Sequence, residues 1–298
     1  MARVQSNGIE IEYERFGASQ AEAVLLIMGL GRQLVSWPET LCEMLVARGY
    51  QVIRFDNRDV GLSSHFDEAG VPDFSAIIKD LKAGKQPQTP YSLDDMADDA
   101  AGLLSALGID SAHVVGASLG GMIAQTLAIR HPARVASLTS MMSHTGRQDL
   151  PSGRPDVVAR LFTPLAREQE ARIDQMTETA ALLAGSAYPA ERALIRERMK
   201  RAYERDHRAT GTARHLAAIL THPSREPDLQ KLQIPTLVLH GSDDPLIPVA
   251  CGEITAEVIP NARLEIIEGW GHDLPTPLLP RLVELISAHA SGSRTFAG

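Results

Sequence analysis

Cysteine is scarce in this sequence of 298 residues, which contains only Cys42 and Cys251. Two cysteines are too few for a disulfide scaffold, so the fold must depend on a hydrophobic core. We therefore expect a reducing, cytoplasmic setting in which both thiols are buried packing residues rather than reactive groups.

Long apolar runs and an excess of basic residues are also missing. No segment approaches the roughly 18 apolar residues of a membrane-spanning helix. The N-terminal segment contains no apolar core of a signal peptide either. The 29 Lys and Arg residues are outnumbered by 37 Asp and Glu residues, which gives a net charge of −8. This balance argues against nucleic acid and against an anionic membrane as partners, and it leaves a homodimer open.

The remaining composition is typical of a globular α/β protein, with 44% hydrophobic and 22% charged residues. Residues 8–16 alternate between apolar and polar and predict a half-buried edge strand. The continuous apolar run at 23–28 predicts a strand buried on both faces. Further strands are predicted at 51–55 and 135–141, and helical segments separate the three. This alternation predicts a mostly parallel sheet flanked by helices on both faces.

The pattern changes between residues 145 and 228, where strand signals vanish and several helices are interrupted by proline and glycine. Strands return at 236–240 and 263–267. We therefore predict a core made of residues 1–144 and 229–298, and a helical cap of residues 145–228 above the C-terminal edge of the sheet. Another segment, from 65 to 90, is expected to be an irregular surface excursion.

The stretch from His113 to Met122 begins as a β-branched run and continues as a helix former, with Gly116-Ala-Ser118-Leu-Gly120 between the two parts. A strand that turns into a helix within a few residues needs small neighbours, which the two glycines provide. This Gly-x-Ser-x-Gly pattern is typical of a nucleophile elbow, so Ser118 is the predicted nucleophile.

A serine hydroxyl needs an adjacent base that is oriented by a carboxylate. The predicted strand at 236–240 is followed by Asp243 and Asp244, and the strand at 263–267 is followed by Gly271 and His272. Both groups would lie at the sheet edge that carries Ser118. Serine, acid and histidine also follow one another in the order found in α/β-hydrolases.

These motifs make the chain resemble the α/β-hydrolase superfamily over nearly its whole length. In that family the acid lies three residues after the glycine of a His-Gly pair, which implies Asp244 as the acid and leaves Asp243 to cap the turn. Residues 28–31, Trp37-Pro38 and residues 54–63 resemble the branch that contains aclacinomycin methylesterase, near the cofactor-free haloperoxidase-like esterases. Met28 replaces the histidine usual in the family's oxyanion motif, which removes a side chain but no backbone donor.

The resemblance implies a serine carboxylesterase that hydrolyses small to medium esters through an acyl-enzyme. His272, oriented by Asp244, would accept the Ser118 proton. The backbone N–H groups of Leu30 and Leu119 would form the oxyanion hole. Gly29, Trp37 and His144 are candidate pocket residues, and no metal or cofactor is required. The uncharged stretch 179–190 favours an apolar acyl or alcohol portion.

Two alternatives stay open: a carbon–carbon bond hydrolase of the same fold acting on diketone-type substrates, and a ligand receptor with little turnover. Haloalkane dehalogenases and epoxide hydrolases are disfavoured because those relatives carry aspartate at the nucleophile position. Asp56, Arg58 and Asp59 are expected to fix a turn rather than to act as acid or base. His207, His215 and His222 could lie on the surface or in a pocket wall.

Overall fold

The computed structural model describes residues 1–206, 208 and 210–293, so the prediction for His207 lies outside the described residues. One sheet of eight strands has the order β1-β2-β4-β3-β5-β6-β7-β8. Neighbouring strands from β4 to β8 are parallel, whereas β2 is antiparallel to both β1 and β4. The strands are β1 (Ala2–Ser6), β2 (Ile9–Phe16), β3 (Ala23–Ile27), β4 (Gln51–Phe55), β5 (Ala112–Ala117), β6 (Val135–Met141), β7 (Thr236–Gly241) and β8 (Arg263–Ile267).

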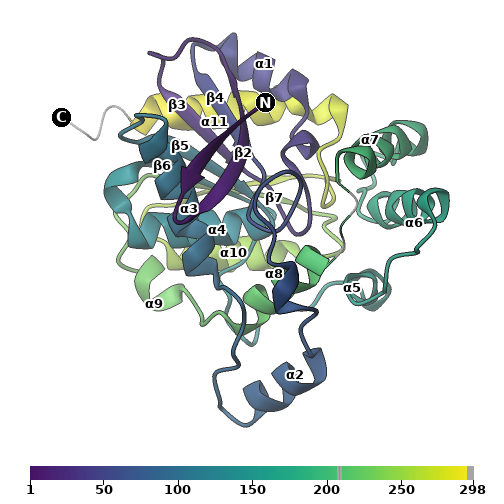
Figure 1. Cartoon of the computed structure of the whole chain (residues 1–298). Coiled ribbons are helices and arrows are strands. Elements are labelled where there is room, and N and C mark those ends of the chain that lie inside the picture. The colour runs from purple at the N-terminus through teal and green to yellow at the C-terminus, as the bar shows by residue number, and fades with distance from the viewer. Residues whose placement is uncertain (207, 209, 294–298) are drawn as a thin grey trace.

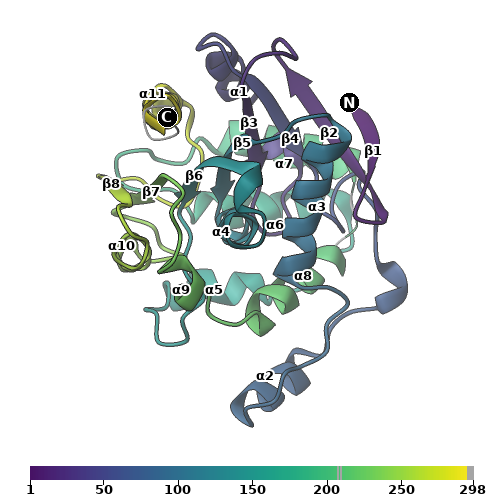
Figure 2. The same cartoon turned by 90° about the vertical axis from the view of Figure 1, so that its left-hand side faces the viewer.

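Helices cover both faces of this sheet, which confirms the predicted α/β class (Figures 1 and 2). One face is covered by α1 and α11, and the other by α3, α4 and α10. The helices are α1 (Glu39–Val46), α2 (Phe74–Lys82), α3 (Leu93–Ala106), α4 (Leu119–Arg130), α5 (Pro155–Leu161), α6 (Gln169–Ala181), α7 (Arg192–Arg205), α8 (Thr210–Thr221), α9 (Glu226–Leu229), α10 (Val249–Val258) and α11 (Leu279–Gly292).

The central strand β3 shows why a continuous apolar run forms a strand here. Leu25 and Ile27 belong to the hydrophobic core on the α3 and α4 side, whereas Val24 and Leu26 belong to the core on the α1 and α11 side. Successive side chains of a strand point to opposite faces, so a strand covered on both faces needs apolar residues at every position.

The prediction of an edge strand at 8–16 is wrong in one respect, because β1 lies outside β2 and forms the edge. Asn7 and Gly8 join the two strands with φ angles of 48° and 79°. Two positive φ angles are what a two-residue hairpin turn requires, and Asn-Gly is its commonest sequence. The short, mostly exposed β1 therefore pairs through its backbone, without a strong apolar pattern of its own.

The segment 65–90 is less irregular than predicted, since it contains α2. Asp73 caps this helix by accepting a hydrogen bond from the Ala76 N–H at 3.0 Å. Figure 2 shows α2 projecting away from the body of the molecule. The ring of Phe74 meets that of Phe162, at the end of α5, edge-to-face with centroids 5.8 Å apart.

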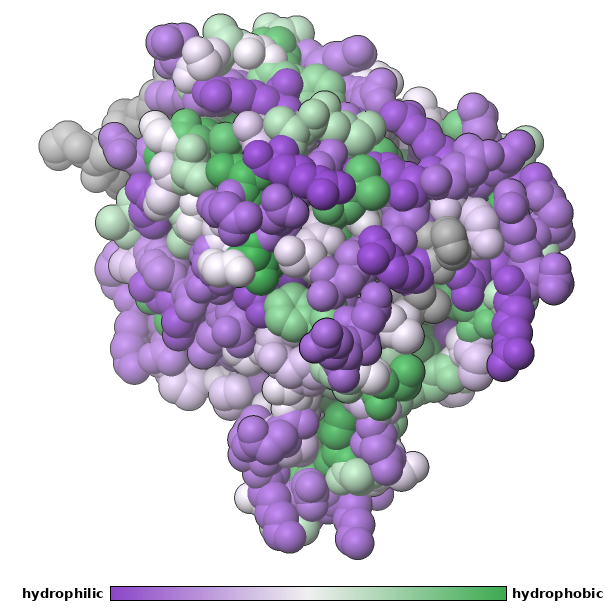
Figure 3. All heavy atoms as spheres, in the orientation of Figure 1, coloured by the Kyte–Doolittle hydropathy of each residue, from purple (hydrophilic) through white to green (hydrophobic). Residues whose placement is uncertain are grey.

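The chain between β6 and β7 folds as α5 to α9, and its described residues contain no strand. Helices α6 and α7 pack against each other, and hydrophilic side chains dominate their surface on the face shown in Figure 3. Helix α8 is different, because Arg214, His215, Ala217 and Ala218 are completely buried. The segment predicted as one cap thus includes a helix that is part of the core packing.

Both thiols are free and buried, as expected. Burial raises the pKa of Cys42 to about 12 and that of Cys251 to about 11. Neither sulfur is therefore a reactive thiolate near neutral pH. Among the described residues, every helix is too short or too polar to traverse a bilayer.

Candidate active site

Ser118 occupies a strained backbone position between β5 and α4, with φ of 57° and ψ of −121°. Its N–H donates to the Met141 carbonyl at 2.9 Å, and its carbonyl accepts from the Ser143 hydroxyl at 2.8 Å. A non-glycine residue keeps such a conformation only when its surroundings enforce it, and such strain clusters at functional sites. These contacts fix Ser118 at the carboxyl end of β5.

The two glycines of the elbow are required by close backbone contacts. A Cβ on Gly116 would lie 2.0 Å from the carbonyl oxygen of Gly120. A Cβ on Gly120 would lie 2.0 Å from the carbonyl oxygen of Ile27, at the end of β3. Gly116 therefore lets α4 return directly over β5, and Gly120 lets the loop after β3 approach the start of α4.

Asp244 and His272 come together from the loops after β7 and β8. Oδ2 of Asp244 lies 2.7 Å from Nδ1 of His272, and both side chains are nearly fully buried. Oδ1 of Asp244 accepts the N–H groups of Leu246 and Ile247 at 2.9 and 2.8 Å. Burial raises the pKa of Asp244, but the neighbouring imidazoles of His272 and His240 outweigh burial and hold it far below its usual range.

The carboxylate thus stays ionised, and a proton on Nδ1 of His272 satisfies it. That arrangement leaves Nε2 of the imidazole as the nitrogen available to accept a proton. Neighbouring Asp243 is oriented differently, because its Oδ2 accepts the Ser186 N–H at 3.0 Å. The structure therefore brings Asp244, and not Asp243, to the histidine.

Two further titratable groups adjoin this pair, and sequence reasoning missed their connection to it. Nε2 of the buried His240 donates to the Ile247 carbonyl at 2.8 Å and lies 3.4 Å from Oδ2 of Asp244. Asp273 directly follows His272, and its buried Oδ1 has no hydrogen-bond partner among the described residues. Burial raises the pKa of Asp273 to about 7. The signal for His240 was present in the sequence, since it ends the strand that leads to Asp244.

The loop after β3 lies directly beside Ser118. A Cβ on Gly29 would lie 3.1 Å from Cβ and 3.6 Å from Oγ of Ser118. The backbone N–H groups of Leu30 and Leu119 donate to no acceptor among the described residues. Leu119 is the first residue of α4, where the helix dipole favours negative charge. Two unengaged N–H groups near one hydroxyl are suited to bind an oxyanion.

The remaining predicted pocket residues, Trp37 and His144, differ in how deeply they are buried. Trp37 is completely buried in the core on the α1 and α11 side, so the prediction that it lines a pocket is wrong. A large aromatic ring gains more from that apolar packing than from a solvent-filled cleft. His144 is half-buried and accepts the Gly146 N–H at Nδ1. Burial, aided by Arg225 and His240, lowers the pKa of His144 to about 4, so the ring is neutral near pH 7.

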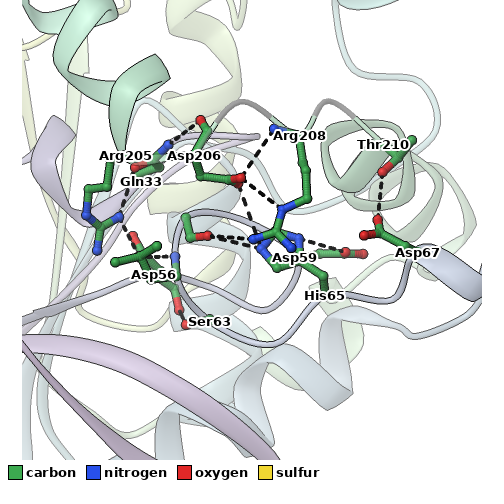
Figure 4. Close-up of polar contacts among 12 residues, drawn as sticks. Gln33, Asp56, Asp59, Ser63, His65, Asp67, Arg205, Asp206, Arg208 and Thr210 are labelled. Carbon is green, nitrogen blue, oxygen red and sulfur yellow. Dashed lines mark hydrogen bonds and ion pairs between the residues drawn. The ribbon is translucent and has the colours of Figure 1, made fainter.

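The turn after β4 is a buried anchor, which confirms the structural interpretation of its charged residues. Asp56 accepts the Leu34 N–H at 2.7 Å and pairs with Arg205 at 2.6 Å (Figure 4). Arg58 pairs with Asp99 on α3 at 2.7 Å. The partners on α3 and α7 lie far away in the sequence, which is why no local pattern revealed them.

Asp59 forms the most deeply buried of these ion pairs. Both of its oxygens accept from Arg214 of α8, at 2.6 and 2.7 Å, and both side chains are fully buried. Ligand atoms of Asp59, His65 and Asp67 also lie within 4.8 Å of one another, as a metal site would require. The Arg214 guanidinium already neutralises Asp59, so this set is poorly suited to a cation.

His215, the next residue of α8, reaches the loop beside Ser118. Its Nε2 donates to the Arg58 carbonyl at 2.7 Å, and its Nδ1 accepts the Gly31 N–H at 3.4 Å. Burial lowers the pKa of His215 to about 4, so it remains neutral near pH 7. Helix α8 thus connects the predicted oxyanion loop to the turn after β4.

A cavity of about 670 Å³ opens beside the loop after β7. Asp243, Asp244 and Pro245 line one side, while residues 152–155 and 184–186 line the other. A cavity of this size can hold a small organic molecule. It lies between the strand-end loops and the segments that connect β6, α5, α6 and α7.

The chain is similar to known hydrolases in both sequence and structure. The alpha/beta hydrolase fold family matches residues 22–275. The chain is 30% identical over 298 residues to rhodomycin D methylesterase DauP of Streptomyces sp. (strain C5), with 93% of each chain covered. It is also 30% identical over 191 residues to 2-hydroxymuconate semialdehyde hydrolase of Pseudomonas putida, covering 61% of this chain and 63% of that protein.

Among solved structures, the meta-cleavage product hydrolase CumD of Pseudomonas fluorescens IP01 superposes with a TM-score of 0.75. The two sequences are 20% identical, and the superposition covers 98% of both chains. At this identity the likeness concerns the fold.

Proposed function

The chain belongs to the alpha/beta hydrolase fold family and is a hydrolase, and from this premise we propose that it is a serine carboxylesterase acting on small to medium esters. The observation that carries the proposal is the 2.7 Å contact between Asp244 and His272, at the same sheet edge as the strained Ser118. Similarity to a methylesterase over nearly the whole chain supports an ester as substrate.

In the proposed reaction, Nε2 of His272 accepts the hydroxyl proton while Oγ of Ser118 attacks the ester carbonyl. The ionised Asp244 stabilises the imidazolium that forms. The N–H groups of Leu30 and Leu119 would bind the tetrahedral oxyanion, and losing one such donor typically lowers the rate by ~10²–10³-fold. His272 then returns the proton to the leaving alcohol, and water hydrolyses the acyl-enzyme with His272 again as base.

The test is turnover of p-nitrophenyl esters from acetate to octanoate, together with labelling by a fluorophosphonate. We expect the purified protein to hydrolyse these esters and to gain one phosphonyl adduct on Ser118. Ser118→Ala should abolish both signals with an unchanged circular dichroism spectrum. Ser105→Ala, an exposed serine on α3, is the matched control and should retain both. Full turnover by Ser118→Ala would disprove the proposal.

The second candidate is a carbon–carbon bond hydrolase, favoured by the similarity to 2-hydroxymuconate semialdehyde hydrolase. Both reactions use the same side chains, so a direct comparison of substrates must separate them. Faster cleavage of a vinylogous diketone than of any p-nitrophenyl or methyl ester would favour this candidate.

Single labelling of Ser118 without steady-state turnover would instead indicate a ligand receptor. A cytoplasmic location is part of the same proposal.

A further inference from the structure

A second, smaller cavity of about 50 Å³ lies immediately beyond the loop that follows β3. Gly31 and Arg32 line it from that loop, and helices α6 and α7 close it from the other side. Liquid water occupies about 30 Å³ per molecule, so this space can hold one small polar group but not a whole organic ligand. Leu30, a predicted oxyanion donor, is the neighbour of Gly31.

The Arg32 guanidinium has no carboxylate partner among the described residues around this cavity. Among the described residues, its guanidinium donates only to the sulfur of Met199, at 2.9 Å, and forms no ion pair. A thioether is a weak acceptor, whereas the half-buried guanidinium of Arg32 carries five N–H donors. Burial lowers the pKa of Arg32, which is the expected effect of an uncompensated positive charge.

The described residues that line the cavity include more basic than acidic side chains. Arg172 and Arg208 also line it, and Asp206 is the acidic residue among the described lining residues. The Asp206 carboxylate is already engaged, because Oδ1 accepts from Arg208 at 2.9 Å and Oδ2 lies 3.8 Å from Nε2 of His65 (Figure 4). In a protein with a net charge of −8, this local arrangement is suited to an anion.

We propose that this cavity binds a carboxylate carried by the acyl part of the substrate, with Arg32 as the residue that recognises it. The proposal rests on the esterase function proposed above. A guanidinium offers two parallel donors that match a planar carboxylate, and a carboxylate fits the available volume.

The acyl part is assigned because of where the leaving group must lie. The alcohol oxygen has to face His272 to receive its proton, whereas none of the described lining residues comes from the loops after β7 and β8. Since Gly31 adjoins Leu30, the carboxylate would lie only a few bonds from the scissile carbonyl. This differs from the apolar substrate portion predicted from the uncharged stretch 179–190, because that stretch contributes to the larger cavity instead.

The test compares two p-nitrophenyl esters with five-carbon acyl chains: the valerate, which is neutral, and the hydrogen glutarate, which ends in a carboxylate. We expect the wild-type protein to prefer the glutarate ester, mainly through a lower KM. Arg32→Gln should lower kcat/KM for the glutarate ester by about 10- to 100-fold, the usual strength of a hydrogen-bonded charge, and change the valerate by less than about threefold. The kcat/KM of Arg32→Lys for the glutarate ester should lie between the values of the wild type and of Arg32→Gln.

Arg201→Gln removes an exposed arginine of helix α7, one of the two helices that close the cavity. It is the matched control, and both esters are expected to react as in the wild type. Titration calorimetry with glutarate adds a readout that needs no turnover, and binding should be lost in Arg32→Gln. If the valerate is hydrolysed through Ser118 but Arg32→Gln affects both esters equally or neither, the carboxylate site is wrong and the esterase function stands. If neither ester reacts but glutarate binds through Arg32, the carboxylate site stands and the esterase function is wrong.

Discussion

Nδ1 of His272 lies 2.7 Å from Oδ2 of Asp244, while the adjacent Asp243 carboxylate accepts a backbone N–H from Ser186. Two neighbouring carboxylates thus have separate tasks in the structure, one at the imidazole and one at the α6–α7 connection. This difference can be measured directly, because the same substitution is available at both positions.

Asp244→Asn should lower kcat/KM for p-nitrophenyl butyrate by about 10³- to 10⁴-fold, because an amide cannot stabilise the imidazolium and favours the wrong tautomer. Asp243→Asn is the matched control and should retain activity within about threefold, since the Ser186 N–H and the Ser242 hydroxyl, and not His272, approach its carboxylate. An equal loss in both variants would contradict the assignment.

Gly120→Ala should impair both activity and folding, because the added Cβ would lie 2.0 Å from the Ile27 carbonyl oxygen. The β3 loop or the start of α4 must then shift, and overpacking of this kind typically destabilises by about 1–3 kcal/mol. Gly292→Ala makes the same change where nothing lies within 4 Å. Urea unfolding and ester turnover would measure both variants, and a Gly120→Ala protein that matches Gly292→Ala would refute the close contact.

Arg214→Leu should destabilise the protein by about 3–5 kcal/mol, because it leaves the buried Asp59 carboxylate without its counter-charge. The double variant Asp59→Asn, Arg214→Leu should recover part of this loss, since no uncompensated charge remains. Chemical unfolding monitored by circular dichroism measures both. As a comparison, Arg192→Ala breaks an exposed pair with Glu178 and should change stability by less than about 1 kcal/mol.

The contribution of His215 to stability should fall as the pH decreases from about 6.5 to about 4, opposite in sign to that of Asp273, whose pKa burial raises to about 7. Burial lowers the pKa of His215 to about 4 in the folded protein, whereas an unfolded histidine titrates near 6.5. Between these values the unfolded chain binds the extra proton and the folded one does not, so unfolding becomes easier as the pH falls. Across this pH window His215 should lower the free energy of unfolding by about 2–3 kcal/mol.

His215→Gln removes this titration but can still donate to the Arg58 carbonyl. The unfolding free energy of this variant, measured relative to that of the wild type at the same pH, should therefore increase as the pH falls across the window. Some dependence should remain, because burial also lowers the pKa of His144 to about 4. Equal slopes in the two proteins would show that His215 does not resist protonation in the folded state.

Much of the fold could be predicted from local patterns. The strand β3 is a continuous apolar run because both faces of the sheet are covered there, and the elbow has glycines because backbones meet there. The edge strand β1 was missed because a short polar strand held by a hairpin turn has almost no hydrophobic pattern. The helix α2 was missed as well, within a segment expected to be irregular. Trp37 was misplaced because an aromatic side chain suits a core and a pocket equally well in a sequence.

The sequence by itself determined the α/β class, the order of Ser118, Asp244 and His272, and their positions after the strands β5, β7 and β8. Only the tertiary structure decided that His240 adjoins Asp244, that α8 is anchored in the core by Arg214, and that Arg32 faces a small cavity. The physical reason is range: apolar periodicity and turn residues act over a few neighbours, whereas ion pairs and cavities join segments that only packing brings together.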